Sequence, residues 1–308
     1  MRSHEPTEDE MTAVDERTSL VRSTLIAGIE RVDLRVRDVE ASLRFYRDVV
    51  GLRVTEQGPD RAALAAPGGA ALLTLASSGV TQAADPRATG LFHIAIRFPG
   101  RAALGDALAR LAGAGLPIGA GDHAVSEALY VSDPDGNGVE LYYDRPVEEW
   151  PPPAGGALVP MVTLPVDLQG LLADGRGGAA VGGPAPAGTD MGHVHLQVSD
   201  VERTVAFYSG ELGLDLTARM GAEAGFFSSN GYHHNVGANS WQSRGSAPAG
   251  RDHAGLDRVV FVVTDADALE RVRLRLAEHG RATEGEAGRS LVVRDPDGIE
   301  LVFEVAAS

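Results

Sequence analysis

The chain has 308 residues, enough for about two domains, and its 44% hydrophobic and 23% charged residues are typical of a globular protein. Its formal net charge of −16 argues against nucleic acid as a partner, and the lack of cysteine excludes disulfide bonds and thiolate chemistry. No apolar run approaches the ~20 residues that cross a bilayer, so we expect a cytoplasmic protein with no membrane partner.

The N-terminal part of the chain predicts a tail and then a first module. Residues 1–25 are acidic, polar and aperiodic, and we predict a disordered tail there. Glu30–Arg37 alternates strictly and predicts a half-buried strand. Asp38 is then placed to cap an amphipathic helix that ends at Gly51. Short strand patterns follow the helix, so the first module is predicted to be β-α-β-β-β.

A second module of the same kind opens at Gly90–Phe98 and closes with two strands on either side of the turn sequence Asp133–Gly138. These modules make up a predicted N-terminal domain of residues 26–146. The chain then becomes rich in Pro, Gly and Ala, which predicts a linker over residues 147–189. The remainder, residues 190–308, is the predicted C-terminal domain.

The pattern of the first half returns in the second half. Val198–Leu216 repeats Val36–Val54 nearly position for position, and Gly255–Val263 repeats Gly90–Phe98. An internal repeat of roughly 160 residues, each copy built from two β-α-β-β-β units, indicates four modules. We therefore predict an α+β fold in which the two modules of each half pair, giving two cup-shaped half-barrel domains with helices outside.

Candidate ligands for a metal ion are concentrated in the second half. In the strand predicted at Met191–Ser199, alternation places His193 and His195 on one face and apolar side chains on the other. A second pair, His233–His234, follows about forty residues later, and Glu300 lies on the last predicted strand. Two histidines and one carboxylate form the ligand set of a non-haem Fe(II) oxygenase.

Several motifs resemble a known family. The first helix of each half begins with D-V-E-A-S-L-R-F-Y (38–46) or D-V-E-R-T-V-A-F-Y (200–208). The closing turns are D-P-D-G-N-G-V-E-L (133–141) and D-P-D-G-I-E-L (295–301). With the four modules, these sequences resemble the vicinal oxygen chelate superfamily, which contains glyoxalase I, antibiotic-resistance binding proteins and extradiol dioxygenases.

Within that superfamily the resemblance is to catechol 2,3-dioxygenase-like two-domain proteins. It is carried by segments such as G-H-V-H-L-Q-V-S-D (192–200) and G-Y-H-H-N-V-G-A-N-S-W (231–241), and it extends over about residues 25–305. The resemblance implies a metal site in a cup formed by strands, with ligands on first strands and on the last strands of modules.

The resemblance assigns the metal ligands of the C-terminal domain residue by residue. His193 matches the first-strand ligand and Glu300 the last-strand ligand. Arg258 stands where the family has its second histidine, so His234 is the expected second ligand, with His233 as the other choice. The predicted metal set is therefore His193, His234 and Glu300.

The same resemblance predicts the remaining roles. His195 and His233 are the expected acid–base residues near the metal. The N-terminal domain is expected to hold no metal, because Arg31 occupies its first-strand position. His93 and Glu140 alone would leave that domain with two ligands.

The resulting functional hypothesis is an extradiol dioxygenase that cleaves a catechol-type small aromatic substrate with O2. Its expected cofactor is Fe(II), with Mn(II) as an alternative, and a homo-oligomer is expected. Two alternatives remain at this point. One is a non-catalytic drug-binding protein of the same fold, and the other is a glyoxalase-type metal-dependent isomerase or lyase.

Overall fold

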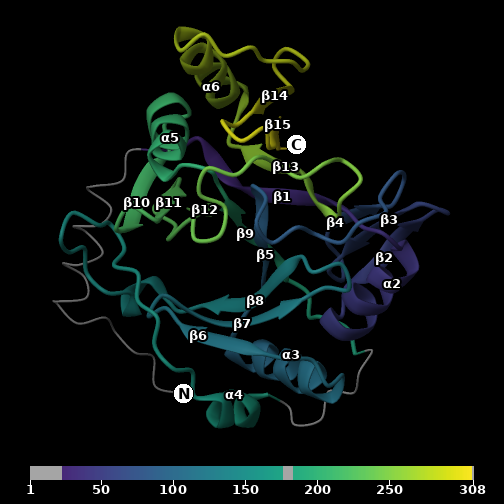
Figure 1. Ribbon diagram of the computed structural model, residues 1–308. Helices are drawn as coiled ribbons and strands as arrows, with labels where there is room; N and C mark the ends of the chain where they lie inside the picture. The colour runs from purple at the N-terminus through teal and green to yellow at the C-terminus, as the bar shows by residue number, and fades with distance from the viewer. Residues whose placement is uncertain (1–22, 176–182, 307–308) are drawn as a thin grey trace.

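The computed structural model describes residues 23–175 and 183–306 (Figure 1). Residues 1–22 of the predicted tail and residues 176–182 of the predicted linker lie outside the described residues. The last residues of the predicted tail are held in place, because the backbone N–H of Ser23 donates to Asp215 at 2.9 Å. Within the described ranges, no helix combines the length and the apolar character that a membrane span requires.

The strands form two sheets. The seven-stranded sheet has the order β14 (Ser290–Arg294), β15 (Glu300–Val305), β13 (Gly255–Val263), β1 (Ile26–Arg35), β4 (Ala71–Ala76), β3 (Arg61–Ala65) and β2 (Arg53–Gln57). The eight-stranded sheet has the order β10 (Asp215–Met220), β11 (Ala224–Ser228), β12 (Val236–Asn239), β9 (Asp190–Gln197), β5 (Gly90–Arg97), β8 (Gly138–Asp144), β7 (Ser126–Ser132) and β6 (Gly119–Asp122). The predicted α+β fold of four modules is confirmed. The first three modules are β-α-β-β-β, whereas the fourth has only the two strands β14 and β15 after its helix.

The pairing of modules differs from the prediction. At the centre of the seven-stranded sheet β1 runs antiparallel to β13, and at the centre of the eight-stranded sheet β5 runs antiparallel to β9. The first module therefore shares a sheet with the fourth, and the second with the third. The halves 26–146 and 190–308 are units of repetition, but the sheets do not follow them. Because all four modules have similar local patterns, either pairing satisfies those patterns, and only long-range contacts select one.

Helices cover the outer faces of the sheets (Figure 1). They are α2 (Val39–Leu43) continued by η1 (Arg44–Val50), α3 (Arg101–Gly113), η2 (Val147–Glu149), α4 (Leu168–Asp174), α5 (Val201–Val205) continued by η3 (Ala206–Glu211), and α6 (Ala266–Glu278). Asp38 caps α2 by accepting from the N–H groups of Glu40 and Ala41, as predicted, and Asp200 caps α5 in the same way.

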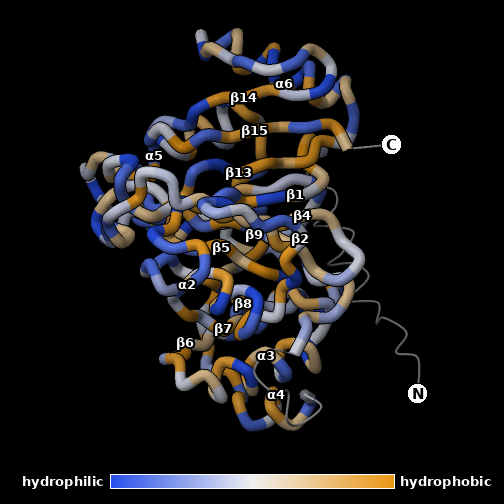
Figure 2. Tube along the Cα trace, turned by 90° about the vertical axis from the view of Figure 1, so that its right-hand side faces the viewer, coloured by the Kyte–Doolittle hydropathy of each residue, from blue (hydrophilic) through white to orange (hydrophobic). Residues whose placement is uncertain are grey.

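The D-P-D-G turns tie the two modules of each half together across the sheets. The Tyr46 hydroxyl in the first module donates to Asp133 in the second at 3.0 Å, and the Tyr208 hydroxyl in the third donates to Asp295 in the fourth at 3.2 Å. One apolar core that includes residues of both sheets lies beneath the helices. In Figure 2 hydrophobic stretches run along the central strands of both sheets.

Part of the predicted linker is a strap, defined here as residues 157–164, that spans the eight-stranded sheet from edge to edge. At one end the N–H of Leu158 donates to the carbonyl of Thr217 in β10 at 2.8 Å. At the other end Leu164 and Asp122 in β6 exchange two backbone hydrogen bonds, at 2.8 and 2.9 Å. Because β10 and β6 are the two edge strands, the strap crosses over the concave face of that sheet.

Candidate metal centre

Strand register places three potential ligands on one face of the eight-stranded sheet. Ala95 in β5 lies opposite His193 in β9 and opposite Glu140 in β8. Side chains at opposed positions share a face, and so do residues two apart in a strand, which adds His93 to the group. The small side chain of Ala95, which is fully buried, leaves space between the carboxylate and the imidazole of its two neighbours.

The ligand atoms of these three residues converge. Nε2 of His93 lies 2.8 Å from Oε2 of Glu140, and Nε2 of His193 lies 3.2 Å from the same oxygen. The three side chains offer one atom each within 4.8 Å of one another, and all three are buried. Nε2 of His93 has no hydrogen bond of good geometry in spite of its short contact. Two nitrogens and a shared carboxylate oxygen fit a divalent cation, which would satisfy all three atoms.

The electrostatics of the group favour the form that binds metal. Burial lowers the pKa of His193 to about 4, and Glu140 offsets only part of this effect, so His193 is neutral near pH 7. Burial by itself would raise the pKa of Glu140, but the adjacent His193 and His93 outweigh burial and hold the pKa well below its usual value. A neutral imidazole and an ionised carboxylate are the forms in which these side chains coordinate a cation.

A cavity of about 280 Å³ opens on the three residues. Its other walls are mostly apolar, aromatic or imidazole side chains, among them Phe92, Phe226, Trp241, His195, His234 and, from the strap, Met161 and Val162. Phe92 and Trp241 meet edge to face, with ring centroids 5.5 Å apart. The cavity therefore combines a polar floor with walls suited to a flat apolar ligand.

His195 reaches this cavity because the neighbouring strand carries glycine. It lies opposite His93 in the register and its ring centroid is 5.0 Å from that of His93. A Cβ atom at Gly237 would lie 2.9 Å from Nδ1 of His195, so a larger residue would displace the ring. Nε2 of His195 is buried and has no hydrogen-bond partner among the described residues. Burial lowers the pKa of His195 well below its usual value.

His233 and His234 lie at different distances from the cavity. His234 lines the cavity, and its ring centroid lies 4.1 Å from that of His193. His233 lies behind it, 1% exposed, with Nδ1 2.8 Å from Nδ1 of His234 and Nε2 2.9 Å from Asp144. The structure thus brings His193, His195 and His234 together, and places His233 one hydrogen bond away from the cavity.

Glu300 is not part of this cluster, which corrects the expected ligand set of His193, His234 and Glu300. It lies on β15 in the seven-stranded sheet, where it forms ion pairs with Arg258, at 3.3 Å, and Arg294. The carboxylate beside His193 is Glu140, and the second histidine beside that carboxylate is His93. Both are in the half that was expected to hold no metal.

The sequence contained the signal for this set. His93 and Glu140 stand on the first and last strands of the second module, as the family pattern requires. In the prediction these two residues were too few for a metal site, because the second module was expected to pair with the first. Pairing it with the third module adds His193 and completes two histidines and one carboxylate.

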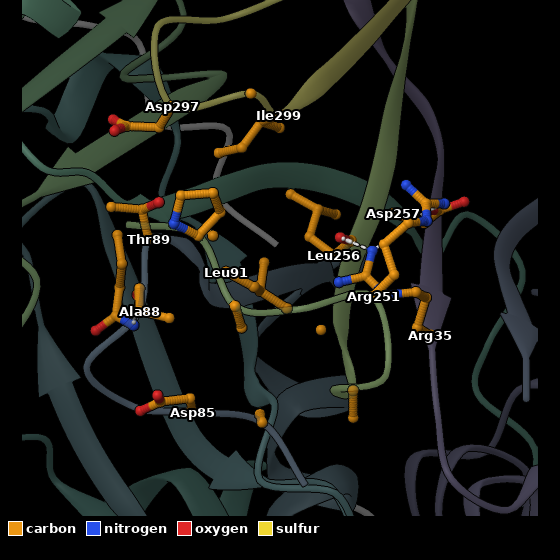
Figure 3. A pocket seen from close by; sticks show the side chains of 18 of the residues that line it. Arg35, Asp85, Ala88, Thr89, Leu91, Arg251, Leu256, Asp257, Asp297 and Ile299 are labelled. Atoms are coloured by element: carbon orange, nitrogen blue, oxygen red, sulfur yellow. Dashed lines mark hydrogen bonds and ion pairs between the residues drawn. The ribbon is translucent and has the colours of Figure 1, made fainter. Parts of the chain in front are cut away.

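A second cavity, of about 230 Å³, lies where the two sheets meet (Figure 3). Its charged side chains largely satisfy one another, since Asp257 pairs with Arg251 at 2.9 Å and with Arg35 at 3.3 Å. Within residues 23–175 and 183–306, three convergent metal-ligating side chains occur only at His93, Glu140 and His193. We therefore treat the cavity above these three residues as the functional site.

Comparisons with known proteins agree with this architecture. The model of the Glyoxalase/Bleomycin resistance protein/Dioxygenase superfamily matches residues 28–141 and 190–303. A relative in Bacillus subtilis (strain 168), catechol-2,3-dioxygenase, is 42% identical over 275 residues, which cover 88% of this chain and 95% of the relative.

Two solved structures share the fold at low sequence identity. A provisionally named dioxygenase from Bacillus subtilis subsp. subtilis str. 168 has a TM-score of 0.61 and 15% identity, covering 93% of this chain and 87% of that one. Glyoxalase I from Zea mays has a TM-score of 0.53 and 17% identity, covering 90% of this chain and 92% of that one. At such identities the likeness shows the fold alone.

Proposed function

Because the chain belongs to the Glyoxalase/Bleomycin resistance protein/Dioxygenase superfamily, as its motifs predict, we propose that it is an extradiol dioxygenase that cleaves a catechol-type aromatic with O2. The observation that carries the proposal is the buried set of His93, His193 and Glu140 beneath a cavity with aromatic walls. The relative that is 42% identical bears the name of this activity.

The three residues would hold a divalent cation, with Fe(II) as the expected ion and Mn(II) as the alternative. A facial set of two histidines and one carboxylate leaves open positions, and the bound ion would supply Lewis acidity and redox chemistry for the reaction with O2. Glu140 contributes the only negative charge of the set. Because an imidazole carries no charge when it coordinates a cation, a bound divalent cation would leave the site with net positive charge, which favours an anionic phenolate.

The remaining walls orient the ring. Phe92, Phe226 and Trp241 offer aromatic faces and edges to a flat substrate, and the strap contributes Met161 from the opposite side. The three ligand side chains are buried at the floor of this cavity of about 280 Å³, which limits the contact of the reacting atoms with bulk water. The strap is anchored at both sheet edges, so it acts as a fixed wall that limits substrate size.

Two imidazoles are placed to handle the hydroxyl protons of the substrate. His195 and His234 both line the cavity beside the ligand set, and each can accept a hydrogen bond from a phenolic hydroxyl. His233, the other predicted catalytic histidine, acts from behind His234 in this proposal. His195 retains the role predicted for it.

Oxygen uptake by metal-loaded protein tests the proposal. Protein loaded anaerobically with Fe(II) should consume O2 when a catechol is added, and His193→Ala should abolish that consumption. His279→Ala is the matched control, because His279 is exposed at the end of α6 and its ring nitrogen Nδ1 bonds to a backbone carbonyl of that helix, far from the cavity. Loaded protein that binds Fe(II) stoichiometrically yet leaves a panel of catechols and hydroquinones unchanged would refute the proposal.

The donor set also separates this proposal from its alternatives. A glyoxalase-type isomerase is expected to use a second carboxylate ligand, and none of the described residues adds one to the set of His93, Glu140 and His193. A protein that only sequesters a drug needs no metal, so purified protein free of bound metal and without affinity for Fe(II) or Mn(II) would favour that alternative.

A further inference from the structure

Asp144, His233 and His234 form a continuous chain of hydrogen bonds that ends at the cavity. Oδ1 of Asp144 lies 2.9 Å from Nε2 of His233, and Nδ1 of His233 lies 2.8 Å from Nδ1 of His234. Both histidines are at least nine-tenths buried, and Asp144 is 18% exposed. Since Nδ1 of His234 is engaged by His233, Nε2 is the nitrogen left to face the cavity that His234 lines.

Asp144, at one end of this row of hydrogen bonds, determines which ring nitrogen of each histidine carries a hydrogen. Burial by itself would raise the pKa of Asp144, but hydrogen bonds from His233 and Arg97 outweigh burial and lower it, so the carboxylate is ionised and only accepts. With a single ring hydrogen, His233 donates it from Nε2 to this carboxylate and accepts at Nδ1. The hydrogen at the contact between the two Nδ1 atoms belongs to His234. Nε2 of His234 is left without a hydrogen.

We propose that Asp144 and His233 are positioning residues that fix His234 in the tautomer whose Nε2 accepts a hydrogen bond in the cavity. The identity of the donor, a phenolic hydroxyl of the substrate, rests on the proposed function, whereas the tautomer does not. A hydroxyl that enters the cavity finds an acceptor of fixed direction, which orients the ring before any bond is broken. The opposite tautomer would present an N–H group and bind the ionised oxygen instead.

The hydrogen bonds around Asp144 hold its carboxylate in the orientation in which Oδ1 faces His233. Its second oxygen, Oδ2, accepts from Nη1 of Arg97 at 3.0 Å and from the Tyr232 hydroxyl at 3.0 Å. Arg97 is held in turn by Asp190 at 2.7 Å. These bonds leave Oδ1 as the oxygen that faces His233. Asp144 and the proposed ligand Glu140 lie four residues apart on β8, so one strand carries both the metal site and the group that orients its histidine.

Asp144→Asn should reverse the direction of donation along the hydrogen bonds from residue 144 through His233 to His234, and the structure gives the reason. Because Arg97 and Tyr232 both donate at the Oδ2 position, the oxygen of the amide takes that position and its NH2 group faces His233. Nε2 of His233 must then accept, Nδ1 of His233 donates, and Nε2 of His234 becomes an N–H group. Asp190→Asn is the matched control, because it alters the other partner of Arg97 and does not contact either histidine.

Two-bond ¹H–¹⁵N spectra of the metal-free full-length protein at pH 8 report these tautomers directly. His233→Gln and His234→Gln assign the signals. Wild-type protein and Asp190→Asn should show His234 with hydrogen on Nδ1 alone, and Asp144→Asn should show hydrogen on Nε2. The proposal is overturned by Nε2–H in wild type, by an unchanged tautomer in Asp144→Asn, or by inversion in Asp190→Asn. If Asp144→Asn does not fold, the wild-type spectrum still tests the proposal, because it shows which ring nitrogen of His234 carries the hydrogen.

Kinetics of the Fe(II)-loaded enzyme separate this inference from the proposed function. With a catechol, kcat/KM of Asp144→Asn should fall by about 10² to 10⁴-fold, the usual contribution of one acid–base group, while Fe(II) stoichiometry is unchanged. The predicted tautomers in a protein inert to catechols would refute the proposed function and support the inference. Full kcat/KM in a variant with an inverted tautomer would overturn the inference.

Discussion

Replacing Glu140 by Gln is the sharpest test of the metal centre, because it removes the only charged ligand and conserves shape. Oε2 of Glu140 is within 3.2 Å of Nε2 of both His93 and His193, and the side chain is 3% exposed. An amide oxygen in its place offers a divalent cation no net charge. We expect the affinity for the cation to fall at least about 100-fold, the upper end of what outer-shell substitutions cost at metal sites.

The magnitude follows from linkage between binding and folding. A cation at 100 times its Kd stabilises the folded protein by about 2.7 kcal/mol, which for a chain of this size corresponds to roughly 4 °C in Tm. If the Kd rises 100-fold at the same cation concentration, the stabilisation falls to about 0.4 kcal/mol, or roughly 1 °C. The expected loss is therefore well above the error of a thermal melt.

The assay is thermal unfolding followed by tryptophan fluorescence, with EDTA and then with Mn(II), which is stable in air. Comparing each variant with and without cation removes any effect of the substitution on the metal-free protein. Glu300→Gln is the matched control, because Glu300 is the corresponding carboxylate of the other sheet and pairs with Arg258 and Arg294. It should lower Tm slightly and leave the cation-induced shift intact. A shift that survives in Glu140→Gln, or disappears in Glu300→Gln, would refute the assignment of ligands.

Three further predictions follow from single contacts. Gly237→Ala places a Cβ 2.9 Å from Nδ1 of His195, so kcat should fall about 10-fold or more while cation-induced stabilisation is retained; an unchanged kcat would exclude His195 from the reaction. Met161→Ala removes a wall contributed by the strap, so kcat/KM for alkyl-substituted catechols should rise relative to catechol; an unchanged ratio would show that the strap does not select substrates. Burial raises the pKa of Asp295 to about 6, so the folded state holds this proton more tightly than the unfolded chain does. The stability that Asp295 contributes should be fully present below about pH 4 and be lost as pH rises toward 6, at most about 3 kcal/mol; urea unfolding at pH 4.5 and 7 should show a difference that Asp295→Asn reduces, and an identical difference in both proteins would contradict the argument.

Local features of the fold could be predicted from the sequence because they depend on neighbouring residues. Asp38 as a helix cap, strict alternation around His193 and the D-P-D-G turns each express a preference within a few residues, and each is present in the structure. The internal repeat established four modules for the same reason, since each module has its own pattern of strands and helix.

The partner of each module could not be read from such patterns. The choice between Ala95 lying opposite His193 and a pairing within each half depends on contacts between segments about one hundred residues apart. That choice decided the carboxylate of the site, because it joins His193 to Glu140 and sends Glu300 to the other sheet. Arg258, at the place of the expected histidine, was the one local sign that the second half does not complete a metal site by itself.

The crossed pairing of modules has a consequence for biosynthesis. When the ribosome has released residues 26–146, β1 and β5 are exposed as unpaired inner edges, because their partners β13 and β9 have not yet been made. The nascent chain therefore holds two templates for strand addition until the second half arrives, and in that interval the same strands, β13 and β9, of a neighbouring nascent chain can add to them. In such an interleaved pair, β5 and β8 of one copy would face β9 of the other, and each catalytic cup would be assembled from two polypeptides.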